Sequence, residues 1–212
     1  MILKYIISAV IGYALGNISS GLLIGKAFGL KDIRKVGSGN AGTTNVLRNL
    51  GWLPSVLTLV GDCLKGLVAC VIGRALGGDL GMLIGGLASI VGHDFPAAFG
   101  FKGGKGIATS LGVILAIDPR LALALLAVQI VAVALTRYMS VASLITTVAF
   151  PVLTALLYRQ RESYSLLVIF SIAMSALSLF GHRGNIVRLL RGEENKLDFK
   201  RISEKSRSLF KK

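Results

Sequence analysis

A glycine-rich polar stretch over residues 35–48 carries the strongest chemical signal in this sequence. Its backbone N–H groups can turn inward as an anion nest, because glycine adopts the required conformations without steric cost. Arg48 at its end offers a planar fork of donors that suits a phosphate group. A tight loop that caps a helix would explain the glycines, but not so many donors ending in an arginine. We therefore predict a phosphate-binding loop, with the ligands Ser38, Gly39, Asn40, Thr43, Thr44, Asn45 and Arg48.

A second basic loop, residues 99–106, has the same character. It ends where a helix is expected to begin, and helix N-termini attract anions. It is not a Walker P-loop, because the spacing before Gly-Lys is too short and Gly106 stands where Ser or Thr is required. In the first loop, Gly37-x-Gly39-x-x-Gly42 formally matches a dinucleotide-binding fingerprint, but no βαβ unit is expected around it. The predicted phosphate ligands of the second loop are Lys102, Gly103, Gly104 and Lys105.

Asp62 and Lys65 lie in an apolar stretch at a spacing that lets them pair on one face of a helix. Each charge costs about 2.5–3.5 kcal/mol near the middle of a membrane helix. Two interpretations are open: a buried structural pair, or a lysine that faces a bound phosphate and is held by its aspartate. Lys65 is accordingly included among the predicted phosphate ligands.

A third polar group, His182-Arg183-Gly184-Asn185, lies at the C-terminal end of another apolar stretch. We predict phosphate contacts for His182 and Asn185, and His182 is also the candidate for a general base. An ordinary polar role for this histidine is equally open. Ser143 either caps a helix or binds substrate. Neither histidine has an acidic residue five positions later, so the sequence lacks an H-x-x-x-x-D acyltransferase dyad.

Other signatures of chemistry are missing from the sequence. There is no G-x-S-x-G nucleophile elbow, and no Cys and His spacing or paired carboxylates of the kind that bind a metal. Cys63 and Cys70 are too far apart along one helix to form a disulfide. We therefore expect neither a metal nor a cofactor.

The composition places these loops in a membrane protein. Hydrophobic residues make up 53% of the 212 residues and charged ones 16%, and the mean hydropathy is +0.72. Soluble domains carry about 25% charged residues. A soluble globular enzyme, a disordered chain and a fibrous protein are excluded. The net charge of +14 could suit a polyanionic partner, but its distribution fits membrane topology better, and no nucleic-acid partner is expected.

Seven apolar stretches are candidate membrane spans, although residues 79–91 and 107–117 are too short to decide alone. With seven crossings, eighteen of the 24 Lys and Arg fall on one side, and this bias marks the cytoplasm. A single crossing over residues 107–135 would destroy the bias. We predict an all-α integral membrane protein with the N-terminus outside, the C-terminus cytoplasmic, and seven transmembrane helices, namely residues 2–25, 52–73, 79–91, 107–117, 121–135, 141–158 and 164–180.

Glycines four positions apart favour close packing of these helices into one bundle. Residues 1–194 are predicted to form a single membrane domain, and residues 195–212 a basic cytoplasmic tail. The tail either lies on the anionic leaflet or is disordered. The closely spaced pairs are Gly12/Gly16, Gly21/Gly25, Gly73/Gly77, Gly77/Gly81 and Gly81/Gly85.

The polar groups also resemble a known family by their order and spacing. The chain is similar to the bacterial acyl-phosphate:glycerol-3-phosphate acyltransferases (the PlsY family) over nearly its whole length, through about residue 194. The tail lies outside the resemblance. The motifs are Gly37-Ser38-Gly39-Asn40-Ala41-Gly42-Thr43-Thr44-Asn45, Asp62-x-x-Lys65-Gly66, Gly92-His93-x-x-Pro96 with Phe101-Lys102-Gly103-Gly104-Lys105-Gly106, and His182-Arg183-x-Asn185-Ile186.

The resemblance implies transfer of an acyl group from acyl phosphate to the 1-hydroxyl of glycerol 3-phosphate. The products are lysophosphatidic acid and phosphate, in the first committed step of bacterial phospholipid synthesis. It implies a multi-pass protein of the bacterial cytoplasmic (inner) membrane with its site facing the cytoplasm. The resemblance also implies a substrate-assisted reaction, in which a phosphate oxygen of the donor accepts the hydroxyl proton. By motif, the two phosphates are surrounded by Ser38, Thr44, Arg48, Lys105, Ser143, His182 and Asn185, with Ser140 and Lys102 as neighbouring alternatives to Ser143 and Lys105.

We expect a monomer whose partners are the two substrates and membrane lipid. Two other functions suit the same loops. A transporter or channel for a phosphorylated anion predicts inverted repeats and mid-membrane charges. The sequence shows no repeat, and its mid-membrane candidates are Asp62 and Lys65. A non-catalytic assembly protein would leave the loop over residues 102–106 unexplained.

Overall fold

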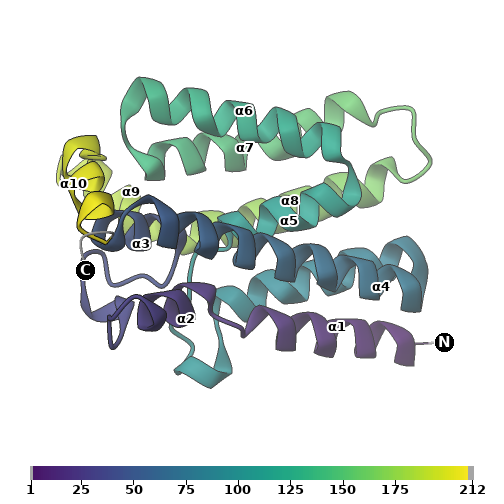
Figure 1. Ribbon diagram of the computed structural model, residues 1–212. Coiled ribbons are helices and arrows are strands. Elements are labelled where there is room, and N and C mark those ends of the chain that lie inside the picture. The colour runs from purple at the N-terminus through teal and green to yellow at the C-terminus, as the bar shows by residue number, and fades with distance from the viewer. Residues whose placement is uncertain (1, 210–212) are drawn as a thin grey trace. The chain divides into compact units, whose positions relative to one another are not determined.

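The chain folds into helices, as its composition predicts. The computed structural model describes residues 2–209, which contain ten α-helices and no β-strand (Figure 1). The helices form two compact units. The first unit is Met1–Val113 with Asp198–Lys212, and the second is Ile114–Leu197. The all-α fold class is therefore confirmed.

The first unit begins with an apolar helix that is interrupted by polar residues. The interruption follows Gly16, and the Asn17 side-chain amide donates to the Tyr13 carbonyl oxygen at 2.8 Å, where the helical hydrogen bonds stop. The predicted first span is thus two helices end to end. The helices of this unit are α1 (Leu3–Gly16), α2 (Ser20–Ala27), α3 (Thr43–Leu50), α4 (Trp52–Asp94) and α10 (Phe199–Leu209).

Helix α4 bends back on itself at two glycines. Gly77 and Gly78 have non-helical dihedral angles, and Gly78 has a φ of +64°, which favours glycine. A Cβ added to Gly73 would overlap the Gly81 carbonyl oxygen, and one added to Gly85 would lie 2.7 Å from the Ala69 carbonyl oxygen. The two arms of α4 are therefore antiparallel and in backbone contact. They correspond to the predicted spans over residues 52–73 and 79–91.

Helix α1 packs closely against the second arm of α4. A Cβ on Gly12 would overlap the Gly85 carbonyl oxygen, and one on Gly16 would overlap that of Ser89. A Cβ on Gly92 would in turn overlap the Tyr13 carbonyl oxygen. In lipid, such close backbone approach is a main source of helix association. These glycines thus pack as their four-residue spacing predicts.

The second unit contains a run of apolar helices that follows the short helix α5 (Ile107–Ile117). Helix α5 has the bounds predicted from the sequence, and it crosses the boundary between the units. Asp118 then caps the next helix, since its carboxylate accepts from the Arg120 N–H at 2.8 Å. The remaining helices are α6 (Pro119–Thr136), α7 (Met139–Leu157), α8 (Tyr164–Gly181) and α9 (Arg183–Leu190).

Polar side chains connect the helices of the second unit. The Thr146 hydroxyl donates to the Gln129 side-chain oxygen at 2.9 Å and so joins α7 to α6. The hydroxyls of Thr147 and Ser178 lie 2.9 Å apart and join α7 to α8. Because lipid offers polar groups no partner, such bonds between helices help to fix the packing.

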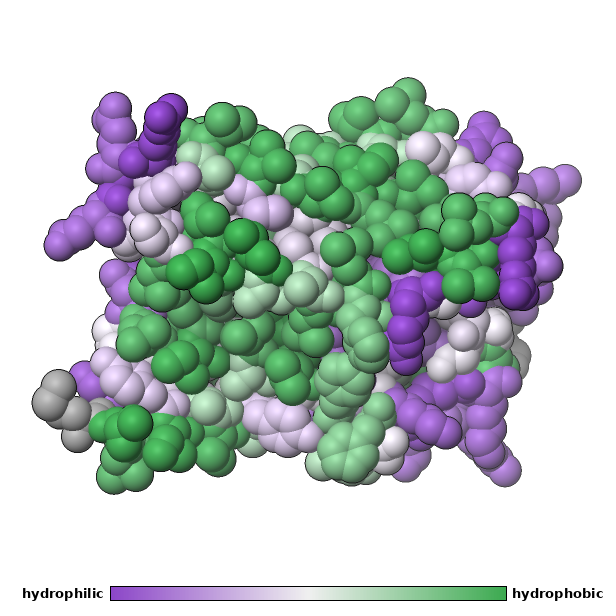
Figure 2. Space-filling view, turned by 180° about the vertical axis from the view of Figure 1, so that it is seen from behind, coloured by the Kyte–Doolittle hydropathy of each residue, from purple (hydrophilic) through white to green (hydrophobic). Residues whose placement is uncertain are grey.

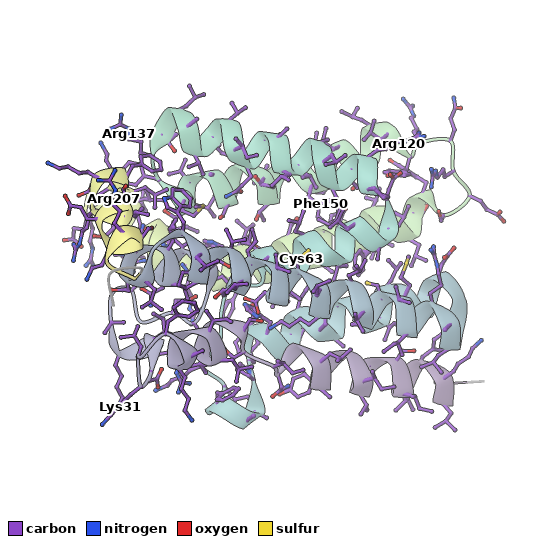
Figure 3. The ribbon with its side chains drawn as sticks, viewed as in Figure 1. Lys31, Cys63, Arg120, Arg137, Phe150 and Arg207 are labelled. Carbon is purple, nitrogen blue, oxygen red and sulfur yellow. The ribbon has the colours of Figure 1, made fainter. Side chains whose placement is uncertain are left out.

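Among the residues that the structure describes, five helical segments are long and apolar enough to cross a membrane: Leu3–Ala27, Trp52–Phe99, Pro119–Thr136, Met139–Leu157 and Tyr164–Gly181. Helix α5 is apolar but shorter. Hydrophobic side chains cover much of the visible surface (Figure 2), as lipid contact requires. Within the second unit, Arg120 and Arg137 lie at opposite ends of α6, with Phe150 between those levels (Figure 3). The number of crossings and the orientation stay predictions.

The predicted tail contains a helix in the part of the chain that the structure describes. Ile202 of α10 is buried, and the Ser206 hydroxyl accepts from the Trp52 N–H at 3.0 Å, where α4 begins. Lys31 and Arg207 extend from the same end of the first unit, whereas Cys63 lies about midway along the first arm of α4 (Figure 3). Of the two alternatives for the tail, disorder does not apply to residues 199–209.

Candidate phosphate-binding site

The first predicted phosphate loop is organised around the buried side chain of Asn45. Its Nδ2 donates to the carbonyl oxygens of Ile33, Val36 and Asn40 at 2.9, 3.0 and 2.9 Å. Its Oδ1 accepts from the Ser38 N–H at 2.9 Å. An amide nitrogen has two hydrogens, so three carbonyl groups share them. Asn45 therefore shapes the loop, while its predicted contact with a phosphate stays a prediction.

Two glycines allow the loop to close around this amide. Gly37 and Gly39 have φ angles of +59° and +72°, which favour glycine. A Cβ on Gly37 would also overlap the Oδ1 atom of Asn45. Ser38 and Gly39 are exposed at the tip of the loop, as a ligand-binding segment requires.

Helix α3 follows the loop and carries, besides Asn45, three of the predicted ligands. Thr43 and Thr44 stand in its first turn, where the N–H groups lack helical acceptors. Arg48 lies one turn after Thr44 and so projects from the same face of the helix. All three side chains are half-buried. Helix α3 therefore carries two hydroxyl groups and one guanidinium that could bind a phosphate.

The second predicted loop contacts the first. The Asn40 side-chain amide donates to the Gly103 carbonyl oxygen at 3.3 Å. The guanidinium of Arg34 donates to the carbonyl oxygens of Phe99 and Lys102 at 2.9 and 3.3 Å. Two segments about sixty residues apart in the sequence thus share hydrogen bonds. The structure brings together the predicted ligands of residues 38–48 with those of residues 102–105.

The Arg34 guanidinium is held in place by Asp32. The Asp32 carboxylate accepts from the Arg34 side chain and from its backbone N–H, both at 2.9 Å. These hydrogen bonds lower the pKa of Asp32 below its ordinary value of 3.8 and raise the pKa of Arg34. Both groups are ionised at neutral pH, and the pair fixes the donor that joins the loops.

The glycines of the second loop rest on the last turn of α4. Gly104 donates its N–H to the His93 carbonyl oxygen at 3.0 Å, and Gly103 donates to that of Asp94 at 3.2 Å. A Cβ on Gly104 would overlap the His93 imidazole. This close approach explains the two glycines before Lys105. Lys105 itself is half-buried, and Lys102 is exposed.

Lys65 lies in a buried cluster in the middle of the first unit. Its Nζ is 2.9 Å from an Asp62 carboxylate oxygen and 2.7 Å from the Nδ1 atom of His93. It also donates to the carbonyl oxygens of Gly16 and Ile18 at 3.1 and 2.7 Å. The predicted pairing with Asp62 is confirmed. Because protein atoms surround the ammonium, these contacts favour the structural interpretation of Lys65 over a ligand-facing one.

The second unit contains the other three predicted ligands. Ser143 on α7 is buried and weakly contacted by the Gln129 amide at 3.4 Å. His182 caps α9, and its Nδ1 lies 2.9 Å from the Ser178 carbonyl oxygen. Helices α7 and α8 are joined where Thr147 meets Ser178. Ser143 and His182 each lie one turn beyond that contact, so they share one end of this antiparallel pair.

Asn185 is fixed by a carboxylate that the sequence did not single out. Its Nδ2 donates to Glu194 Oε1 at 2.9 Å, and Arg188 Nε donates to Glu194 Oε2 at 2.8 Å. Burial alone would raise the pKa of Glu194, but these two hydrogen bonds together hold it below the ordinary value of 4.5. Glu194 is thus an ionised anchor that orients Asn185.

Three residues with clear roles in the structure are not among the ligands predicted from the sequence. Arg34 joins the two loops, His93 supports Gly104, and Glu194 orients Asn185. The available signals were the Asp32-x-Arg34 spacing, a histidine at the end of an apolar stretch, and the two adjacent glutamates, residues 193 and 194, after basic residues. None of these signals specifies the partner, because each contact depends on how the chain folds; the backbone partners of Arg34, for example, are 65 and 68 residues away.

Residues 6–192 match the family model described as glycerol-3-phosphate acyltransferase. The chain belongs to this family. It is 41% identical over 192 residues to the glycerol-3-phosphate acyltransferase of Thermoanaerobacter pseudethanolicus, covering 91% of this chain and 95% of the relative. It is 46% identical over 184 residues to that of Geotalea daltonii, covering 86% and 92%.

Solved structures of the family share the fold. One is PlsY, an integral membrane glycerol 3-phosphate acyltransferase, in its glycerol 3-phosphate form. Its TM-score is 0.83 at 38% identity, and the match covers 92% of this chain and 96% of that one. The lysophosphatidic acid form of PlsY gives 0.82 at 36% identity, with 93% and 97% covered. The resemblance inferred from the four motifs is thus confirmed, and the chain is a member of an integral membrane acyltransferase family.

Proposed function

We propose that this protein transfers an acyl group from acyl phosphate to the 1-hydroxyl of glycerol 3-phosphate, giving lysophosphatidic acid and phosphate. The observation that carries the proposal is the pair of glycine-rich loops joined by the Asn40–Gly103 and Arg34–Lys102 hydrogen bonds. Such loops suit phosphate groups, and both substrates carry one. The relatives' common activity supports the acceptor, and the choice of acyl phosphate as donor rests on the motif resemblance.

Arg48 and Lys105 are proposed to hold the two phosphates. An arginine suits bidentate contact with a phosphate, and a lysine acts as a point charge. The exposed Ser38–Gly39 tip and the first turn of α3, with Thr43 and Thr44, would add neutral donors. Bringing two anions together is a large part of the barrier, and positioning alone supplies up to about 7–11 kcal/mol in favourable cases.

The reaction balances without a strong base from the protein. The hydroxyl oxygen of glycerol 3-phosphate forms a bond to the acyl carbonyl carbon, and the bond from that carbon to the phosphate oxygen breaks. A phosphate oxygen of the donor accepts the hydroxyl proton, so the leaving group departs as hydrogen phosphate. Acyl phosphate is an already activated mixed anhydride, and the reaction as written uses no cofactor.

We further propose that His182, Asn185 and Ser143 contact substrate phosphate. The Ser178 carbonyl can only accept, so the hydrogen of a neutral His182 ring sits on Nδ1 and leaves Nε2 as an acceptor. That tautomer is the one a general base would need. His182 therefore stays the candidate for a base if the donor phosphate does not take the proton.

We also propose a topology for the chain. It crosses the bacterial inner membrane seven times, with the two arms of α4 and helix α5 as separate crossings. The N-terminus lies outside, and the two loops and the C-terminus lie in the cytoplasm. The excess of Lys and Arg in these segments supports this orientation. The proposed acting form is a monomer in contact with membrane lipid.

Purified protein in detergent tests the function. The assay mixes palmitoyl phosphate with glycerol 3-phosphate and follows both phosphate release and lysophosphatidic acid formation. The proposal expects equal amounts of the two products, and none when either substrate is omitted. Product formation from palmitoyl-CoA but not from palmitoyl phosphate would contradict the proposal that acyl phosphate is the acyl donor. Uptake of glycerol 3-phosphate into vesicles without a donor would favour a transporter instead.

A further inference from the structure

The middle of the first unit contains four ionisable side chains that the proposed reaction does not use. They are Asp62 and Lys65 on the first arm of α4, and His93 and Asp94 at the end of its second arm. The side chains of Lys65 and Asp62 are 4% and 1% exposed. Charges at such depth are costly in a membrane protein and are usually retained for a function.

The ammonium of Lys65 is a junction between two segments. It donates to the carbonyl oxygens of Gly16 and Ile18, in the interruption between α1 and α2. The helix ends there, so its last carbonyl groups have no helical partner. Its remaining neighbours are Asp62 and the Nδ1 atom of His93, at 2.9 and 2.7 Å. An ammonium has three hydrogens, and four protein acceptors surround this one.

His93 carries the contact onward to the second phosphate loop. Its Nδ1 atom lies 2.7 Å from Lys65 Nζ and 3.6 Å from an Asp62 carboxylate oxygen, and these contacts hold the ring in one orientation. Gly104 lies against that ring so closely that a Cβ would overlap it, and its N–H donates to the His93 carbonyl oxygen at 3.0 Å. The position of Gly104 in turn sets the position of the adjacent Lys105.

We infer that Lys65 is a positioning residue for the loop of residues 102–105. It acts through His93 and holds the loop and the α1–α2 interruption in one arrangement. This inference rests on the proposed function where it concerns substrate: it assigns Lys65 an indirect effect on the binding of glycerol 3-phosphate. A lysine that touched the phosphate itself would act independently of His93.

The variants remove charges in balanced pairs. Lys65→Met with Asp62→Asn deletes both ions, because removing one alone would leave the other buried and unpaired. His93→Ala deletes the next contact, and a third variant combines all the changes. The matched control is Arg74→Met with Asp79→Asn, which removes an exposed ion pair from the same helix.

Trypsin cleavage after Lys102 and Lys105 reports the loop directly and needs no enzyme activity. We expect cleavage in detergent to become at least about fivefold faster in the Lys65/Asp62 and His93 variants, with the control unchanged, because a released loop opens more often. Cleavage rates equal to those of the parent chain would overturn the inference, whatever the activity.

The kinetic measurement separates an indirect effect from direct contact. In the Lys65/Asp62 variant and in the His93 variant, we expect the KM for glycerol 3-phosphate to rise about tenfold. The KM for palmitoyl phosphate should change less than about twofold. The combined variant should lose little beyond the larger single effect, because both changes break one chain of contacts. Multiplying effects would show that Lys65 acts independently of His93 and would overturn the inference. An inactive parent chain with faster variant cleavage would refute the proposed function alone.

Discussion

Replacing Asn45 by aspartate changes the first phosphate loop at its centre while keeping the size of the side chain. The two N–H hydrogens of Asn45 serve the carbonyl oxygens of Ile33, Val36 and Asn40. In Asn45→Asp, a carboxylate oxygen that can only accept faces these three acceptors. The loop loses its donors and gains an electrostatic repulsion.

The structure gives the size of the effect. Ile33 is 0% exposed, so its carbonyl has no access to water, whereas Val36 and Asn40 are half-buried and can be hydrated. A buried polar group left unsatisfied costs about 1–3 kcal/mol, and the other lost bonds cost about 1 kcal/mol together. A total of about 2–4 kcal/mol shifts the equilibrium away from the formed loop by about 30-fold to 1,000-fold.

The assay is steady-state acyl transfer with glycerol 3-phosphate varied at saturating palmitoyl phosphate. Apparent affinity falls with the fraction of protein that is competent to bind, so we expect the KM for glycerol 3-phosphate to rise at least about tenfold. Asn49→Asp is the matched control, because the half-buried Asn49 amide donates to two oxygen atoms of Asn45 and not to the three loop carbonyl groups that Asn45 holds. It should change the KM by less than about threefold. A folded Asn45→Asp protein with an unchanged KM would refute the assigned role.

Four further predictions follow from single contacts. Arg48→Ala should lower kcat/KM at least about tenfold while His182→Ala keeps residual activity; a larger loss for His182 would make it the general base. The Glu194 pKa is lowered in the fold, so its stabilisation is present above pH 4.5 and lost as the pH falls through the lowered value; Glu194→Gln should flatten that acid-side decline of the thermal midpoint. Ile202→Ala should lower the thermal midpoint, because the Ile202 side chain is 2% exposed and helps to dock α10. Truncating a buried isoleucine to alanine costs about 2–5 kcal/mol of stability. Gly12→Val should reduce the yield of folded protein in size-exclusion chromatography, because α1 and α4 touch there.

The helices were predictable because their signals are local. The bounds of α5 and the glycine contacts of α1 and α4 follow from hydropathy and four-residue spacing, whereas the predicted span over residues 2–25 is two helices. The two arms of α4 match the predicted spans over residues 52–73 and 79–91, but hydropathy does not assign the turn between them to Gly77 and Gly78. The docking of α10 was also hidden, since it depends on the contact of Ser206 with Trp52 far away in the sequence.

The site was predictable in its residue types but not in their individual roles. The i,i+3 spacing predicted that Lys65 pairs with Asp62, yet it left the direction of the ammonium open. The composition of the first loop marked Asn45 as a donor to phosphate, whereas the fold turns its amide toward three carbonyl groups. Side-chain direction is set by tertiary contacts, and a sequence pattern does not contain them. The same limit hid the role of Glu194.

The donor assay tests the central claim most directly. Purified protein receives glycerol 3-phosphate with palmitoyl phosphate in one reaction and with palmitoyl-CoA in another, and lysophosphatidic acid is measured in both. The account predicts product, with matching phosphate release, in the first reaction alone. Product from palmitoyl-CoA alone, or no product with palmitoyl phosphate, would contradict it.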